Sequence, residues 1–227
     1  MSGRKSMELI GYTAPMGTAE RTETRAAPLE SGDRLSRAEF ERRFSARPDI
    51  RKAELIEGVV YLASPVRADD HGEPHFKLTT WLGVYVARQQ GIVHAIDSTV
   101  RLDADNEFQP DLYLAWDAAH GGRARLEDGY LVGPPDLAVE VSASTAARDL
   151  SLKLPVYRRN GVRECLVWQV YEGRIDWFAL DDDGQYQPLP ANQDGLTESR
   201  VFPGLRLDVA AMLAGDLAKV LAALGPA

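Results

Sequence analysis

Two short apolar runs in the middle of the chain each carry one acidic residue that a buried strand does not need. Residues 110–114 hold Asp111 near their start, and residues 136–141 hold Glu140 near their end. Valine, leucine and isoleucine build strands that are buried on both faces, where an ionised carboxylate is costly unless it is paired or binds a metal ion. We therefore expect Asp111 and Glu140 to be partners on neighbouring strands.

The segment between the two acids supports this pairing. Residues 121–135 contain several glycines and prolines, which is typical of a loop that joins two strands. Asp111 and Glu140 are too far apart in sequence to meet within one element. Two carboxylates that converge at a sheet offer hard oxygen ligands, which suit Mg²⁺ or Mn²⁺.

A basic residue follows the second acid on a predicted helix. Asp149, Lys153 and Tyr157 recur at intervals of four residues, so on a helix they share one face, and Lys153 would point back toward the acids. Pro155 opposes a regular helix because it removes one hydrogen bond, at a cost of about 3 kcal/mol. We expect a kink at Pro155 or a helix that begins near Ser151. Taken alone, Asp149 and Lys153 would be an ordinary surface ion pair.

This ordered set of residues resembles a known protein family. Pro110-Asp111, then Glu140, then Asp149-x-x-x-Lys153-x-x-x-Tyr157 is similar to the Uma-two family, which belongs to the PD-(D/E)XK superfamily of restriction-endonuclease-like nucleases. Residues 54–58 and 63–65 also resemble the opening of that family. The resemblance covers residues 36–202. It implies an α/β (α+β) fold with a restriction-endonuclease-like core, in which helices flank a mixed central β-sheet.

The resemblance also implies roles for individual residues. Asp111 and Glu140 would bind Mg²⁺ or Mn²⁺ with the carbonyl oxygen of Val141, and Glu54 would be a third ligand or a supporting carboxylate. The superfamily places its lysine two residues after the second acid, where this chain has Ser142. The lysine role therefore passes to Lys153. Accessory positions implied by the same resemblance are Glu57, His71, Asp149, Tyr157 and Gln169.

Several of these residues also have simpler interpretations. Glu54 and Glu57 could be solvated charges on an edge strand, and His71 could cap a helix or lie on the surface instead of touching a phosphate or an acid. His71 and His75 are four residues apart, but Gly-Glu-Pro between them does not fit the zinc-protease pattern. A zinc site at the two histidines is therefore disfavoured.

The chain as a whole predicts one domain. Its 227 residues suffice for one sizeable core. We expect residues 1–32 to be a flexible leader and residues 33–227 to form a single domain with a C-terminal helical tail, which could cover a sheet edge or a homodimer partner. The lone Cys165 excludes an internal disulfide framework and indicates a reducing cytoplasm. No apolar run approaches the roughly 18 residues that span a bilayer.

The acidic balance is the main objection to a DNA-binding function. A formal net charge of −8 disfavours nonspecific attraction to DNA. A metal ion that supplies positive charge, or basic residues gathered near it, would answer the objection. The candidate basic residues are Arg148, Lys153, Arg158, Arg159 and Arg163.

Other segments show regular patterns. The predicted helices are 36–45, 70–90 and one or two within 205–224. The predicted strands are 54–62 with a turn at Gly58, 92–102 in one or two pieces, 108–114, 136–141, and the hairpin 164–170 with 174–180.

The sequence therefore predicts a Mg²⁺-dependent endonuclease that hydrolyses phosphodiester bonds in DNA. Lys153 would orient the attacking water or stabilise the developing negative charge. One alternative is an inactive protein of nuclease fold that binds nucleic acid or a partner protein, since Ser142 replaces the expected lysine. Another is a metal-dependent hydrolase of small phosphates. A serine hydrolase is disfavoured because the chain lacks a G-x-S-x-G motif.

Overall fold

A six-stranded mixed sheet forms the centre of the molecule. The computed structural model describes residues 27–62, 71–143 and 146–225, with the backbone alone for residues 146–150. The strand order across the central sheet is β12-β11-β10-β9-β6-β3. Strands β9 and β10 are parallel and the other pairs are antiparallel. The strands are β3 (Ile92–Ile96), β6 (Leu112–Trp116), β9 (Leu137–Ser142), β10 (Glu164–Gln169), β11 (Arg174–Leu180) and β12 (Tyr186–Pro188).

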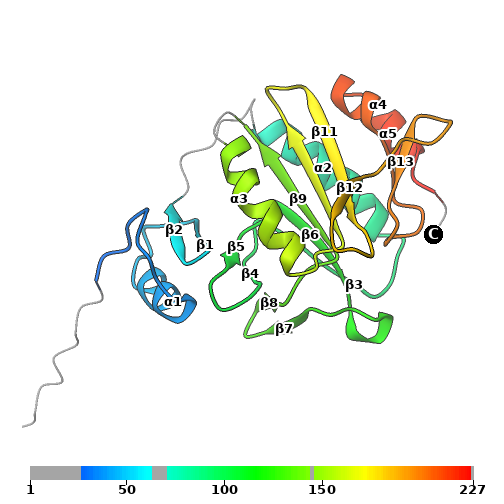
Figure 1. Ribbon diagram of the computed structural model, residues 1–227. Coiled ribbons are helices and arrows are strands. Elements are labelled where there is room, and N and C mark those ends of the chain that lie inside the picture. The colour runs from blue at the N-terminus through cyan, green and yellow to red at the C-terminus, as the bar shows by residue number, and fades with distance from the viewer. Residues whose placement is uncertain (1–26, 63–70, 144–145, 226–227) are drawn as a thin grey trace, which may run out of the picture.

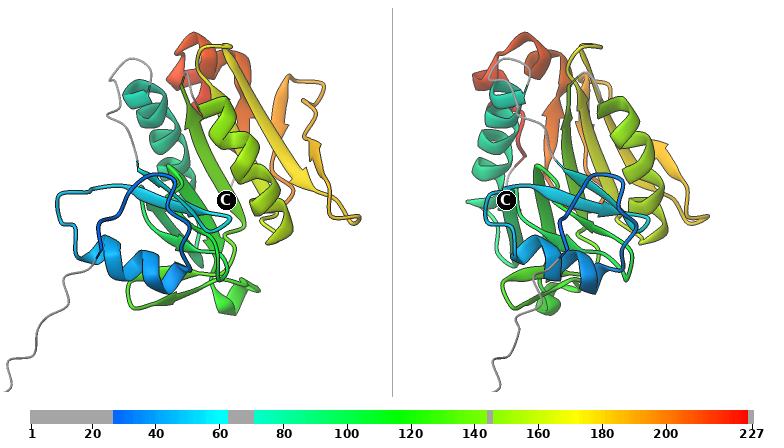
Figure 2. Two further views of the ribbon diagram at one scale, coloured as in Figure 1. Left: turned by 60° about the vertical axis from the view of Figure 1, so that its left-hand side comes forward. Right: turned by 90° about the vertical axis from the view of Figure 1, so that its left-hand side faces the viewer.

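Helices cover both faces of this sheet (Figures 1 and 2). Parallel strands need a crossover connection, and α3 (Ala146–Arg159) makes it between β9 and β10 on one face. Helix α2 (Glu73–Val86) lies on the opposite face with the short helices α4 (Val209–Ala214) and α5 (Leu217–Ala222). Coverage on both sides explains why β9 is buried at every position. The predicted α/β (α+β) architecture is confirmed.

Each face of the sheet has its own apolar core. On the α2 face, Trp81 packs edge-to-face against Trp177, with ring centroids 5.7 Å apart. On the α3 face, Tyr157 packs edge-to-face against Phe108 at 5.3 Å. Because successive side chains of a strand alternate between faces, Glu140 points toward α3, whereas its neighbours on β9 contribute to the α2 core.

A second six-stranded sheet, with order β2-β1-β5-β4-β8-β7, lies beside the central one. Strands β1 and β2 form a tight hairpin whose turn residues Glu57 and Gly58 have φ of 52° and 71°. Two left-handed residues are typical of the hairpin turn that matches strand twist, and the prediction of a turn at Gly58 is confirmed. The strands are β1 (Ala53–Ile56), β2 (Val59–Leu62), β4 (Val100–Arg101), β5 (Glu107–Phe108), β7 (Arg125–Glu127) and β8 (Tyr130–Val132).

Helix α1 (Arg37–Ser45) packs against this second sheet. The Ser36 side chain caps the helix by accepting a hydrogen bond from the Glu39 backbone N–H. Phe40 and Leu29 are buried together in a small apolar cluster with residues of β1 and β2. Leu29 falls within the predicted leader, and residues 1–26 of that leader lie outside the described part of the chain.

The remaining elements are short. A 3₁₀ turn, η2 (Ala118–His120), follows β6, and strands β13 (Leu196–Glu198) and β14 (Arg206–Asp208) form a small separate sheet. Among the described helices, none has the length and apolar composition needed to cross a membrane.

Two predicted elements differ in the structure. The predicted strand 108–114 is interrupted, and its two halves, β5 and β6, belong to different sheets. Pro110 lies in the gap, where it cannot donate a ladder hydrogen bond. Helix α3 begins at Ala146 and continues through Pro155, so a start near Ser151 is wrong. Residues 63–65, part of the family resemblance, lie outside the described residues.

Candidate active site

A buried lysine joins both sheets to helix α3. The Lys153 ammonium nitrogen lies 2.8 Å from Glu54 Oε1 and 3.2 Å from both carboxylate oxygens of Glu140. Glu54 comes from β1, Glu140 from β9 and Lys153 from α3, and the Lys153 side chain is only 7% exposed. Glu54 Oε1 also accepts a hydrogen bond from the Gln109 backbone N–H. The predicted lysine and two of the predicted acids therefore meet.

Tyr157 completes this group one helical turn after Lys153. Its hydroxyl donates a 2.7 Å hydrogen bond to Glu140 Oε1. Burial, together with the nearby Glu140 carboxylate, raises the pKa of Tyr157 well above its usual value, so the hydroxyl stays protonated as a donor. We call Glu54, Glu140, Lys153 and Tyr157 the lysine-centred cluster. The side chain of Asp149, expected on the same helix face, lies outside the described residues.

Asp111 adjoins this cluster from the neighbouring strand. It lies just before β6, which pairs with β9, and it is 2% exposed. Its Oδ2 accepts a 2.6 Å hydrogen bond from the backbone N–H of Val141, the residue after Glu140. Its Oδ1 lies 3.6 Å from Lys52 Nζ and 3.5 Å from His71 Nε2. Asp111 and Glu140 thus occupy neighbouring strands, as their apolar surroundings suggest.

The electrostatics of the site show an excess of negative charge. Burial raises the pKa of Glu140 to about 7; the Lys153 ammonium opposes that rise, and the carboxylates of Asp111 and Glu54 add to it. Burial would lower the pKa of Lys153, but Glu140 and Glu54 outweigh it and raise the pKa. Among the described side chains, three carboxylates thus face two ammonium groups, those of Lys52 and Lys153.

The excess of negative charge bears on whether these residues can bind the metal ion that the resemblance implies. A divalent cation would offset the unpaired negative charge, and carboxylate oxygens are the ligands that Mg²⁺ and Mn²⁺ prefer. Among the described residues, the cationic groups beside Asp111 Oδ1 are His71 Nε2 at 3.5 Å and Lys52 Nζ at 3.6 Å, so this oxygen can accept a ligand bond. The donor set therefore fits a hard divalent ion.

A second set of potential ligands lies on the other side of Asp111. One ligand atom from each of His75, Asp97 and Asp111 lies within 4.8 Å of the other two. His75 Nε2 is 3.9 Å from Asp97 Oδ2, and Lys52 Nζ is 3.7 Å from Asp97 Oδ1. His71 stacks on His75 with ring centroids 5.5 Å apart. We call His75, Asp97 and Asp111 the histidine-side group.

The sequence patterns missed three of these neighbours. Lys52 precedes β1 without any motif, and Asp97 falls within the predicted strand region 92–102. The sequence pattern gives His75 only as half of a histidine pair. Asp97 has a φ of 45°, which is unusual for a residue other than glycine. This is a feature of the folded backbone and cannot be read from the sequence.

The contacts of two predicted accessory residues lie elsewhere. Glu57 is at the tip of the β1–β2 turn, where its exposed carboxylate pairs with Arg159. The Gln169 amide donates a 2.7 Å hydrogen bond to Asp176 on the adjacent strand β11. Both side chains are therefore engaged by partners outside the lysine-centred cluster.

The basic residues of α3 and the following turn are also engaged. Lys153 is buried in the cluster, and Arg158 donates a 2.7 Å hydrogen bond to Gln185 Oε1. Arg159 pairs with Glu57, and Arg163 lies 3.2 Å from Asp136. The Arg148 side chain is not described. The predicted group of basic residues is consequently held by internal partners and does not form a free basic face among the described side chains.

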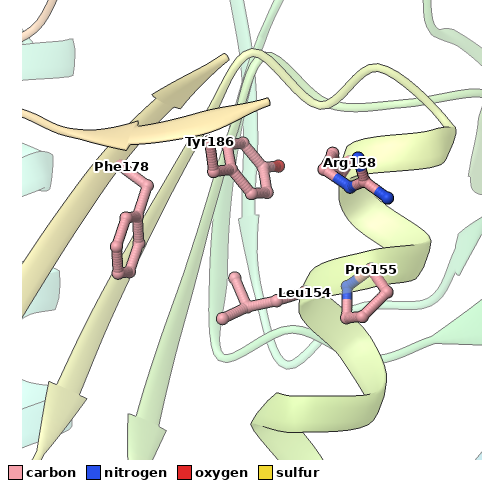
Figure 3. A pocket seen from close by; sticks show the side chains of 5 residues that line it. All are labelled: Leu154, Pro155, Arg158, Phe178 and Tyr186. Carbon is pink, nitrogen blue, oxygen red and sulfur yellow. The ribbon is translucent and has the colours of Figure 1, made fainter. Parts of the chain in front are cut away.

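A shallow hollow of about 200 Å³ lies between α3 and strands β11 and β12 (Figure 3). Apolar side chains supply most of its wall, and the Arg158 guanidinium at its rim is already bonded to Gln185. The lining residues are Leu154, Pro155, Arg158, Phe178 and Tyr186. No acid lines this hollow, so it has none of the chemistry of the acid-rich site.

Comparison with known proteins bears on the same residues. The family model Uma2, described as "Putative restriction endonuclease", matches residues 37–210. The chain belongs to the Uma2 family. The match runs from the start of α1 into α4 and includes every residue of the lysine-centred cluster. The predicted resemblance to this family is therefore confirmed.

A solved structure supports the fold. The chain is similar to a crystal structure from Anabaena variabilis ATCC 29413, described as a "putative nuclease belonging to DUF820", with a TM-score of 0.55 and 14% sequence identity. The similarity covers 71% of this chain and 89% of that chain. A sequence search finds no match among curated proteins.

Proposed function

We propose that the protein is a metal-dependent endonuclease that hydrolyses phosphodiester bonds in DNA. The observation that carries the proposal is the Lys153 ammonium held between Glu54 and Glu140, next to Asp111, in a member of the Uma2 family. Lys153, from α3, would take the role of the lysine that this chain lacks at position 142. This agrees with the assignment of Lys153 to the lysine role.

Asp111 and Glu140 would hold Mg²⁺ or Mn²⁺, with Glu54 and the Val141 carbonyl as further oxygen ligands. The excess of carboxylates over ammonium groups supports this assignment. When bound, the ion would lower the pKa of a water molecule and neutralise charge on the phosphate oxygens.

The side chains of Tyr157 and Lys153 would position the reacting groups. Tyr157 holds Oε1 of Glu140 through its hydroxyl and fixes the rotamer of that carboxylate. Lys153 would orient the attacking water or stabilise the negative charge that develops on the phosphate. A histidine general base is not part of this proposal, because the bound ion would make a water molecule easier to deprotonate and Lys153 would orient it.

Plasmid nicking and single-stranded DNA cleavage test this function. We expect cleavage in Mg²⁺ or Mn²⁺, none in excess chelator, and loss in Asp111→Asn and Glu140→Gln. Asp176→Asn is the matched control, because Asp176 is a part-buried strand acid on β11 that pairs with Gln169 and Arg174. Cleavage that persists in both site variants would refute the assigned residues.

A protein of nuclease fold that binds nucleic acid or a partner protein without cleaving is the second candidate. It is favoured by the absence of lysine at Ser142 and by the paired state of the α3 cations. Calorimetric titration of the wild type and of Glu140→Gln with Mn²⁺ separates the two, because a non-cleaving protein has no need to bind metal through Glu140. The cytoplasmic location and the homodimer stay predictions.

A further inference from the structure

The histidine-side group is built from three elements that meet at one end of the central sheet. His75 lies in the first turn of α2, Asp97 directly follows β3, and Asp111 directly precedes β6. Strands β3 and β6 are antiparallel with Ile96 opposite Leu112, so Asp97 and Asp111 face each other across the strand ends. The Asp97 backbone N–H donates a 3.0 Å hydrogen bond to the Asp111 carbonyl and fixes this register.

The Asp97 carboxylate of this group is only loosely paired among the described residues. The nearest of their cationic groups are Lys52 Nζ at 3.7 Å and His75 Nε2 at 3.9 Å, both beyond ordinary hydrogen-bond distance. His75 Nε2 lies 3.2 Å from the Asp111 carbonyl oxygen, which can only accept, so an ion at Nε2 would replace this hydrogen bond. Two carboxylates thus share one lysine here, and the local charge is negative when both are ionised.

The donor set is that of a cation site. Ligands bound to one ion at about 2.1 Å lie about 3 to 4 Å apart, so the observed 4.8 Å limit leaves only a small closure to complete the site. Imidazole nitrogen favours manganese, zinc and other transition ions over Mg²⁺. The Asp97 side chain is 53% exposed, which gives an ion an open route from solvent.

We propose that His75, Asp97 and Asp111 bind a divalent transition metal ion, at a site separate from the lysine-centred cluster. The two sites share Asp111, but the ion of the histidine-side group does not need Glu140, Glu54 or Lys153. Binding requires His75 in the tautomer that carries its proton on Nδ1, so that Nε2 is free to bind the ion. The site goes beyond the proposed function, because it binds metal whether or not the protein cleaves DNA.

Electron spin echo spectroscopy of the full chain loaded with Mn²⁺ provides the decisive readout. A directly bound imidazole nitrogen modulates the Mn²⁺ echo, whereas a site of carboxylate and carbonyl oxygens gives no such signal. We expect nitrogen modulation in the wild type and in Glu140→Gln, and its loss in His75→Gln. His71→Gln is the matched control, because His71 stacks on His75 but is not one of the three proposed ligands, and it should keep the signal.

Asp97→Asn is a second variant of the same site that should fold normally, because Asp97 is half-exposed and its change leaves the core intact. Calorimetry should show Mn²⁺ affinity at this site reduced at least about tenfold in Asp97→Asn. The proposal is overturned if the wild type lacks nitrogen modulation, if His75→Gln keeps it, or if Asp97→Asn binds Mn²⁺ as the wild type does.

The same variants separate this inference from the nuclease assignment. Cleavage that depends on Glu140, in a protein without nitrogen modulation, would refute the histidine-side site and support the nuclease assignment. Nitrogen modulation in a protein that cuts no DNA would support the histidine-side site and contradict the nuclease assignment.

Discussion

Buried acids occur at both ends of the strands β9 and β10, and the two ends differ in the partners that these acids contact. Glu164 at the start of β10 is fully buried, and it accepts hydrogen bonds from the Ser199 hydroxyl, the Arg200 backbone N–H and the Trp177 indole. Asp136, just before β9, accepts one from the Trp116 backbone N–H. Each of these acids is a single carboxylate: Glu164 is held by three donors, and Asp136 by one backbone donor and an ion pair with Arg163.

The opposite end gathers several carboxylates instead. Glu140, Glu54 and Asp111 surround the ammonium groups of Lys153 and Lys52, and negative charge remains in excess. Burial of an acid therefore does not identify a functional site, because Glu164 is at least as buried as Glu140. What separates this end from the other is that, among the described side chains, three carboxylates from different elements gather around two ammonium groups.

The largest expected effect is on catalysis. Glu140→Gln should lower the single-turnover rate of DNA cleavage at least about a thousandfold, because it removes a metal ligand. Glu164→Gln, on the adjacent strand, should stay within about threefold of the wild type as long as circular dichroism shows a folded protein. Equal losses in both variants would erase the distinction between the two ends.

The next largest effect is on stability. Lys153→Met leaves the carboxylates of Glu54 and Glu140 buried without their shared cation, which should reduce the free energy of unfolding at pH 8 by about 3 to 5 kcal/mol. Adding Glu140→Gln to this variant should recover part of the loss by removing one of the two charges. Urea unfolding measures both, and a double variant less stable than the single one would contradict the proposed charge balance.

A third group of acids, Glu41 and Glu107, surrounds Arg101 away from the candidate site. Arg101 Nε lies 2.9 Å from Glu41 Oε1 and 3.7 Å from Glu107 Oε2. Burial raises the pKa of Glu107 to about 8, and the Glu41 carboxyl adds to the rise. Since this folded-state pKa lies above the ordinary value of 4.5, the folded protein holds an extra proton between about pH 4.5 and pH 8.

Stability contributed by that proton is complete below pH 4.5 and is lost as the pH rises through about 8. Glu107→Gln keeps the hydrogen-bonding shape without the charge. Its free energy of unfolding should exceed that of the wild type by on the order of 1 to 2 kcal/mol at pH 9, and the gain should shrink toward pH 5. If the difference in the free energy of unfolding between Glu107→Gln and the wild type is the same from pH 5 to pH 9, Glu107 is ionised in the folded protein.

The smallest effect is expected for the arginine beside Asp136. The Arg163 side chain is 40% exposed, so its ion pair with Asp136 is largely solvent-screened. Arg163→Met should cost less than about 1 kcal/mol, because Asp136 keeps its hydrogen bond from Trp116. A loss as large as that of Lys153→Met would mean that both ends depend on their cations to the same degree.

Much of the site could be predicted from local patterns. An acid in an apolar run must have a partner, so Asp111 and Glu140 were expected on neighbouring strands, and the register confirms it. Helical spacing placed Lys153 and Tyr157 on one face, and both contact Glu140. These predictions succeed because strand burial and helix periodicity are local properties of the chain.

The rest depends on contacts between distant segments. Strand β1 pairs with β5 far along the chain, and this pairing brings Glu54 next to Gln109 and Lys153. Nothing near Lys52 or Asp97 in the sequence reports such a contact. The same separation explains why a continuous strand was expected over residues 108–114, since each half finds its own partners in a different sheet.

Anomalous diffraction from crystals soaked in Mn²⁺ tests the central assignment most directly. The nuclease assignment predicts an anomalous peak about 2.2 Å from a carboxylate oxygen of Asp111 and one of Glu140, absent in Glu140→Gln crystals. Both acids occupied only by Lys52, Lys153 and Tyr157, with no anomalous peak between them at saturating Mn²⁺, would contradict it.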